Sequence, residues 1–168
     1  MHKEVSDILV EKAEYNVWAN KRIVDVLSCL KAEQLTQKIE SSFTGIYPTI
    51  FHIWNAENIW LERLQGISLN SWPSRDVNDK DNLQKFIQTS KLFLEFLEKN
   101  HRQIEFPFSE ISYSNLKGDF MSNSVYEIVL HCLNHSAYHR GQIVTMLRQL
   151  GVTDIPSTDF IAYLRERR

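Results

Sequence analysis

The chain has 168 residues, of which 43% are hydrophobic and 24% are charged, and this composition suits one globular domain spanning residues 1–168. The formal net charge of −2 provides no electrostatic basis for binding nucleic acid or another polyanion. The N-terminus lacks the apolar stretch of a signal peptide, and no segment is long enough to span a membrane. The two cysteines do not suggest a disulfide framework, so we expect a cytoplasmic protein.

Periodic hydrophobic residues predict three long helices in the first hundred residues. The first spans about residues 5–30, where apolar side chains recur every three or four positions. The second spans about residues 47–65 and the third about residues 80–100. Asn78 or Asp79 is expected to cap the third helix, because a short polar side chain can accept a hydrogen bond from a free amide of the first turn.

Two connections between the predicted helices are long and irregular. Residues 67–78 contain Trp72-Pro73 and are expected to cross an end of the helical bundle. In residues 102–123, a turn-like sequence at 116–118 follows three alternating apolar residues, Ile104, Phe106 and Phe108. This pattern predicts a short, poorly regular hairpin.

The fourth helix has the clearest boundaries. Ser124-Val-Tyr-Glu127 is a capping-box sequence, and Gly151 stands where a helix ends in a left-handed residue. Between them one apolar seam is formed by Ile128, Cys132, His135, His139, Ile143, Met146 and Leu150. A short helix is expected over residues 160–166. The predicted fold class is therefore all-α: a four-helix bundle with at least one crossover connection and a short C-terminal helix.

Two histidines of the fourth helix are candidate metal ligands. His135 and His139 are four residues apart, so a helix turns through about 400° between them and both rings project from one face. His52, on the second helix, is the candidate third ligand, because facing helices of a bundle are where such sites are built. Two alternatives remain open: His52 can be a hydrogen-bonded core residue, and histidines four positions apart also occur by chance.

Other polar residues near these histidines have weaker assignments. Gln142 shares a side of the helix with His135, and it could orient a ligand or bond to a neighbouring helix. Glu57 could accept a hydrogen bond from a ligand imidazole or face solvent. His131 falls on the flank of the seam and is assigned no ligand role. Arg140 lies off the expected metal face, where packing, a neighbouring helix or a dimer contact would occupy it.

Four blocks of sequence, in order, carry a resemblance to a known family. They are Tyr15-Asn-Val-Trp-Ala-Asn20; Ser42-Phe43 with His52-Ile and Glu57-x-x-Trp60-Leu-x-Arg63-Leu; Asn134-His135-x-x-x-His139-Arg-Gly-Gln142; and Leu150-Gly151 with Pro156-x-x-Asp159. Together they cover nearly the whole chain, which resembles the DinB/YfiT-like superfamily of metal-binding four-helix bundles. The resemblance implies a divalent transition metal, most often nickel or zinc and sometimes iron, held by His52, His135 and His139. It also implies a homodimer and a role in stress response.

The chemistry of three imidazoles limits both the metal and the reaction. Three neutral nitrogen donors suit zinc, nickel, copper or iron, and they leave a coordination position open. Relatives in the family transfer low-molecular-weight thiols such as bacillithiol, so the leading hypothesis is a metal-dependent thiol S-transferase that detoxifies small electrophiles. Two alternatives are a hydrolase that uses metal-bound hydroxide and a non-catalytic metal-binding or small-ligand-binding protein.

Overall fold

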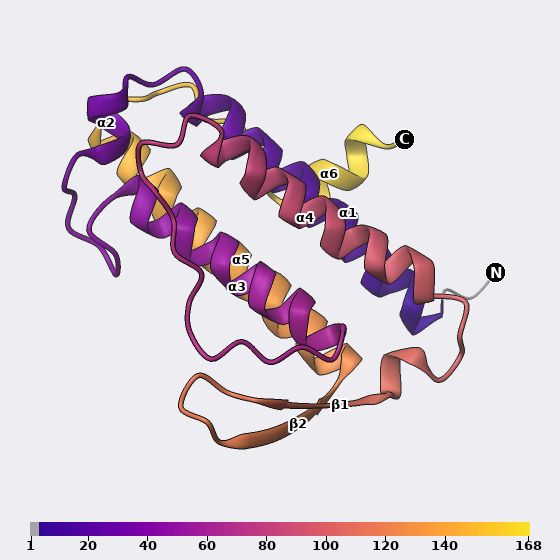
Figure 1. Ribbon diagram of the computed structural model, residues 1–168. Coiled ribbons are helices and arrows are strands. Elements are labelled where there is room, and N and C mark those ends of the chain that lie inside the picture. The colour runs from indigo at the N-terminus through magenta and orange to yellow at the C-terminus, as the bar shows by residue number, and fades with distance from the viewer. Residues whose placement is uncertain (1–3) are drawn as a thin grey trace.

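A computed structural model describes residues 4–168 and places four long helices in one bundle (Figure 1). The helices are α1 (Val5–Leu27), α3 (Ile46–Leu64), α4 (Asn82–Asn100) and α5 (Val125–Gln149). α1 packs against α4 and α5, and α3 packs against the same two helices, so α1 and α3 lie diagonally across the bundle. The arrangement confirms the predicted four-helix bundle.

The crossover predicted from the loop lengths is the connection between α3 and α4. These two helices follow one another in the chain yet run in the same direction, so residues 65–81 return along the length of the bundle (Figure 1). α3 has 19 residues and is about 28 Å long. The returning segment therefore runs beside the bundle, and the prediction that it crosses only a bundle end was wrong.

The interior of the bundle consists of two apolar clusters separated by a belt of buried polar residues. One cluster includes Ile23, Ile50, Phe86, Ile143 and Met146, and the other includes Leu9, Leu61, Leu97, Ile128 and Cys132. The belt between them contains Asn16, Asn20, Glu57, Ser90, Ser136 and Arg140, all buried. Cys132 behaves as a small apolar residue, and burial raises the pKa of its thiol well above the usual value.

The buried side of α5 is rotated relative to the predicted seam. His139, Ile143 and Met146 are buried as expected, but His135 is only half-buried. Ser136 and Arg140, each one position after a histidine, are buried more deeply among the other helices. Both histidines therefore lie on the edge of the seam, facing α3.

The predicted ends of α5 are confirmed. The Ser124 hydroxyl accepts a hydrogen bond from the amide of Glu127 at 3.3 Å, and the Glu127 carboxylate accepts one from the amide of Ser124 at 3.0 Å. At the other end, Gly151 has φ = 80° and the amide of Val152 donates to the carbonyl of Leu147 at 3.0 Å. This is the hydrogen-bond pattern of a Schellman motif, which satisfies the last carbonyls of the helix.

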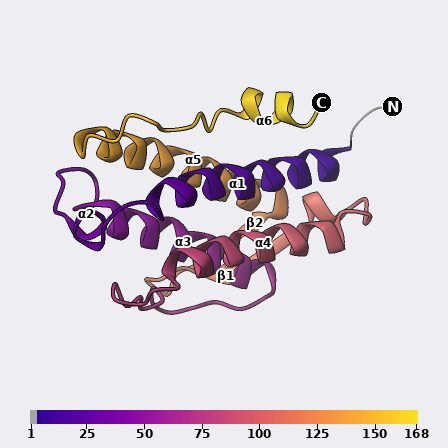
Figure 2. The same ribbon diagram turned by 90° about the horizontal axis from the view of Figure 1, so that it is seen from above.

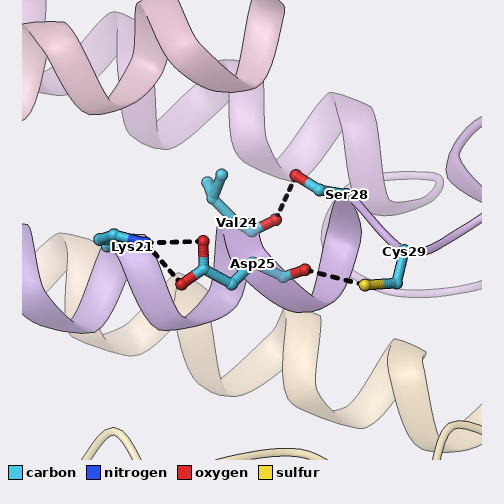
Figure 3. A network of polar contacts seen from close by, with 5 residues as sticks. All are labelled: Lys21, Val24, Asp25, Ser28 and Cys29. Carbon is cyan, nitrogen blue, oxygen red and sulfur yellow. Dashed lines mark hydrogen bonds and ion pairs between the residues drawn. The ribbon is translucent and has the colours of Figure 1, made fainter.

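The first helix is shorter than predicted and ends at Leu27. The Ser28 hydroxyl donates to the carbonyl of Val24 at 2.8 Å, and the Cys29 thiol lies 3.4 Å from the carbonyl of Asp25 (Figure 3). These side chains satisfy carbonyls of the last turn without extending the helix. A short helix, α2 (Ala32–Thr36), follows and had not been predicted.

The predicted hairpin exists, but it begins later than the alternating apolar residues. β1 (Glu110–Ser114) and β2 (Phe120–Ser124) are antiparallel, with Glu110 opposite Ser124. Phe106 and Phe108 instead belong to a 3₁₀ turn, η1 (Phe106–Phe108), because Pro107 removes an amide donor that a strand would use. The predicted cap of α4 was also wrong, since the residue preceding that helix is Asp81.

The predicted C-terminal helix is confirmed as α6 (Phe160–Glu166), which packs on α1. Tyr163 and Arg167 both bind the Glu14 carboxylate, at 2.9 and 2.7 Å. Seen from above, α6 lies on the opposite side of the bundle from the connection between α3 and α4 (Figure 2). The tail therefore covers the α1 side and leaves the α3 side to the hairpin and the long connection.

Candidate metal centre

Three histidines from two neighbouring helices converge on one point. His52 lies on α3, and His135 and His139 lie one turn apart on α5. Their candidate ligand atoms all lie within 4.8 Å of one another, and the Nε2 atoms of His52 and His135 are 2.8 Å apart. Two neutral ring nitrogens this close require a proton on one of them or a cation between them. The donor set therefore fits a divalent transition metal.

The environment keeps two of these imidazoles neutral. Burial lowers the pKa of His52 to about 4, and the neighbouring His139 contributes in the same direction. Burial and the other histidines likewise lower the pKa of His135 to about 4. Metal binds the neutral imidazole, so at pH 7 these rings bind a metal without releasing a proton.

Gln142 holds His139 in place from one turn further along α5. Its Oε1 lies 2.8 Å from Nδ1 of His139, which leaves Nε2 of that ring free to face the other histidines. The Gln142 amide nitrogen donates to the Ser42 hydroxyl at 2.8 Å, and this bond ties the helix to the segment before α3. Of the two roles considered for Gln142, the contact with His139 matches the orienting one, whereas its second bond goes to the loop before α3 and not to another helix.

Aromatic side chains surround the three rings. The Phe43 ring centroid lies 4.3 Å from that of His52 and 5.5 Å from that of His139. Trp72, from the long connection, lies 5.8 Å from His52, and Tyr138 lies 4.9 Å from His139. These rings flank His52 and His139, although Trp72 and Tyr138 are themselves exposed.

A cavity of about 360 Å³ opens beside His135. Its inner wall comes from α3 and α5, through residues that include Trp60, Arg63 and His131. Its outer wall comes from Trp72 and from the turn of the hairpin. The volume is within the range of small-molecule sites, and the candidate metal ligand His135 forms part of the wall.

His131 lies in this cavity and outside the histidine cluster. Its ring packs edge-on against Trp60 at 5.2 Å and is 6.0 Å from the ring of His135. Burial lowers the pKa of His131, and the positive charge of Arg63 adds to the effect. Its position agrees with the flank placement predicted from the sequence.

Glu57 does not contact any of the three histidines. Its carboxylate accepts hydrogen bonds from four other side chains: Asn16 at 2.7 Å, Asn20 at 3.0 Å, Ser90 at 2.5 Å and Ser136 at 2.9 Å. It is 1% exposed, so neither alternative considered for it, a bond to a ligand imidazole or exposure to solvent, describes it. Glu57 is the centre of the buried polar belt.

Arg140 completes this belt from α5. Its Nη1 donates to the side-chain oxygens of Asn16 at 2.5 Å and Asn20 at 2.8 Å, and the residue is 1% exposed. The two asparagines thereby bridge the Arg140 guanidinium and the Glu57 carboxylate. Of the roles considered for Arg140, contact with a neighbouring helix within the same chain is the one the structure shows.

Arg63 and Trp72 were not singled out as site residues from the sequence. A usable signal existed for Arg63, which follows His52 by eleven residues and so lies about 20° away around α3. Trp72 carried no such signal, since its position depends on the path of residues 65–81.

Comparisons with known proteins agree with this fold. A sequence model of the DinB family matches residues 1–168. The chain belongs to the DinB family. It is 30% identical over 171 residues to Protein DinB of Bacillus subtilis (strain 168), covering 95% of each protein. Its fold is similar to the crystal structure of a DinB-like protein from Bacillus cereus ATCC 10987, with a TM-score of 0.66 and 19% identity over 89% of this chain and 94% of that one.

None of the helices within residues 4–168 is long and apolar enough to cross a membrane.

Proposed function

We propose that this DinB family member is a metal-dependent thiol S-transferase whose metal is held by His52, His135 and His139. The observation that carries the proposal is the convergence of three imidazoles on one point, together with a cavity large enough for a small molecule that one of them, His135, lines. Three protein ligands and a neighbouring cavity are typical of a catalytic metal site, whereas structural sites use four protein ligands.

The chemistry of the donor set favours nickel or zinc, with iron as a further candidate. Imidazole nitrogens bind these borderline ions well and bind calcium or magnesium poorly. When bound, such an ion lowers the pKa of a coordinated thiol, and thiolate is the reactive form of sulfur.

The protein's own residues have three roles in this proposal. Gln142 fixes the ring of His139 so that Nε2 faces the cluster. Phe43 and Trp72 pack against His52 and restrict the orientation of its ring. The cavity beside His135 orients the thiol and the electrophile for transfer.

A hydrolase is less well supported by the same geometry. Hydrolysis at such a site needs a carboxylate that acts as acid or base, and the carboxylate nearest in sequence to His52 is that of Glu57. The Glu57 carboxylate instead accepts four hydrogen bonds within the buried belt.

The direct test replaces the two histidines of α5. We expect the double variant His135→Ala/His139→Ala to lose bound metal completely while its far-UV circular dichroism is unchanged, because the apolar clusters remain intact. The measurement is elemental analysis of untagged protein, with His101→Ala as the matched control because His101 lies outside the cluster.

The reaction is tested with the metal-loaded protein. We expect metal-dependent transfer from at least one low-molecular-weight thiol to a bimane-type or epoxide electrophile, and loss of that rate in the double variant. Ester or amide hydrolysis without added thiol would favour the hydrolase. The absence of any metal-dependent rate with a full thiol panel would leave a binding protein and contradict the proposal.

A further inference from the structure

Arg63 is a buried cation without an anionic partner. It is 6% exposed, and its guanidinium carbon lies 4.4 Å from the ring centroids of both Trp60 and Tyr113. Its Nε is buried without a hydrogen-bond partner, and within residues 4–168 no carboxylate forms an ion pair with it. Burial lowers the pKa of this guanidinium, although arginine remains charged at neutral pH.

The other deeply buried arginine, Arg140, has side-chain acceptors and a nearby negative charge, although its Nη2 is likewise buried without a partner. Arg140 donates to Asn16 and Asn20 and lies close to the Glu57 carboxylate that those asparagines also bind. A buried charge is destabilising unless it is paired and hydrogen-bonded, so proteins rarely leave one without acceptors. The two aromatic rings stabilise the positive charge of Arg63. They do not replace the oxygen acceptors that its N–H groups would bind.

Arg63 lines the same cavity as His135. It follows His52 by eleven residues on α3, which corresponds to a rise of roughly 16 Å between their Cα atoms. Two rings lie between Arg63 and His135: the Trp60 centroid is 4.4 Å from the guanidinium carbon and 5.2 Å from the His131 ring, which is 6.0 Å from that of His135. The guanidinium and His135 therefore lie on the order of 10 Å apart. A ligand of that length would contact both ends of the cavity.

The remaining charges of the cavity lie at its rim. Lys117 and Asp119 belong to the exposed turn of the hairpin, and the Asp119 carboxylate accepts a hydrogen bond from the Asn115 amide at 3.0 Å. No ion pair joins Asp119 to Arg63 in the part of the chain that the structure describes. The inner end of the cavity is therefore positively charged.

We infer that Arg63 binds a carboxylate of the thiol cosubstrate while the sulfur of the same molecule reaches the histidine cluster. The carboxylate and the sulfur of this ligand are then roughly 10 Å apart. This inference rests on the proposed function, which brings a thiol to the metal. The planar guanidinium presents two parallel donors, the geometry that matches a carboxylate. The substrate class is accordingly an acidic thiol of intermediate length, and thiols without a carboxylate are poor ligands.

A series of ligands of graded length tests the inference by binding alone. Cobalt-loaded protein is titrated with ω-mercapto acids and with ω-mercapto alcohols of the same length, and the thiolate-to-cobalt absorption band reports binding. We expect acids that span roughly 10 Å to bind about tenfold more tightly than the matching alcohols. Acids too short to reach Arg63 should bind no more tightly than their alcohols.

Variants assign the preference to Arg63. Arg63→Gln is expected to abolish the preference for acids, and Arg63→Lys to retain part of it because the charge remains. Lys91→Gln is the matched control, because this exposed cation of α4 lies outside the cavity lining and its removal should leave the preference in place. If Arg63→Gln does not fold, the length dependence of the parent protein and the Arg63→Lys variant decide the question.

The outcomes separate the two proposals. Equal binding of acids and alcohols at every length, or a preference that survives Arg63→Gln, overturns the carboxylate site. A second series, ω-imidazolyl acids and alcohols, binds cobalt through nitrogen. If no thiol binds but the imidazolyl acids show a preference that depends on Arg63, thiol transfer is overturned and the carboxylate site stands. If neither series shows a preference, the carboxylate site is overturned.

Discussion

Two groups of polar residues lie on neighbouring faces of α5 and behave in opposite ways. Ser136 and Arg140 face the interior, where they join a belt in which the Glu57 carboxylate accepts four side-chain hydrogen bonds. His135 and His139, each one position earlier, face α3, and His135 also lines the cavity, with its Nδ1 buried without a partner. Apart from Nη2 of Arg140, the buried polar side-chain atoms of the belt find partners within the chain, whereas the histidine cluster keeps nitrogen atoms available for a ligand.

The contrast indicates how the fold supports a reactive site. Unsatisfied polar groups destabilise a protein interior, so a cluster prepared for a ligand needs a rigid scaffold beside it. The belt links α1, α3, α4 and α5 through directional hydrogen bonds between residues of all four helices. We expect it to fix the rotation of α5 that turns the two histidines towards His52.

The largest expected effect comes from breaking the belt. Glu57→Ala leaves Arg140 buried without a nearby negative charge, and loss of one partner of a buried pair typically costs about 3–5 kcal/mol of folding free energy. Urea unfolding monitored by circular dichroism measures this loss. Glu98→Ala, at an exposed position of α4, is the control and should change stability by less than about 0.5 kcal/mol. A similar small change for Glu57→Ala would show that the belt contributes little.

The next effect is the response of the histidine cluster to acid. His52 and His135 have pKa values of about 4 in the folded protein and ordinary values near 6.5 when unfolded. Between pH 6.5 and 4 the unfolded chain binds more protons than the folded one, so stability of the metal-free protein falls as pH falls through this window. Thermal unfolding of the metal-free protein at several pH values measures the slope.

A variant checks that the slope belongs to these two rings. His52→Ala/His135→Ala should unfold with a weaker dependence on pH between 6.5 and 4, because two groups with lowered pKa values are absent. An unchanged slope would assign the pH dependence to other groups.

The smallest expected effect comes from the contact that joins the cluster to its surroundings. Gln142→Ala removes the hydrogen bond to Nδ1 of His139. Loss of such a bond to a metal ligand typically lowers metal affinity by about 10- to 100-fold. Competition with a coloured chelator measures the affinity. Gln149→Ala, at an exposed position of the same helix, should leave it unchanged. If Gln142→Ala also has no effect, the orientation of His139 is fixed by Phe43 and Tyr138.

Local signals in the sequence were sufficient for individual helices. The Ser124 and Glu127 pair and Gly151 act within a few residues of their own positions, so both ends of α5 could be predicted. The histidine pair could be placed on one face of a helix for the same reason. Periodicity did not distinguish the buried position of Arg140 from an exposed one, because charge alone does not reveal which neighbours a side chain meets.

Contacts between distant segments could not be predicted from local patterns. The buried position of Glu57 depends on asparagines of α1 and serines of α4 and α5, and no local pattern indicates that these side chains meet one carboxylate. The placement of Trp72 beside His52 depends on the return path of residues 65–81, whose length permits several routes. The cavity and its arginine therefore became visible only with the arrangement of the helices.

The cavity has walls of two different kinds, and this difference has an evolutionary consequence. Its inner wall consists of packed helices that also carry the histidines, whereas its outer wall includes the hairpin turn with the exposed residues Lys117 and Asp119. Exposed turns accept substitutions, insertions and deletions far more readily than packed helices do. Descendants of such a protein can therefore acquire new ligands by remodelling one turn, while the same metal chemistry is inherited unchanged.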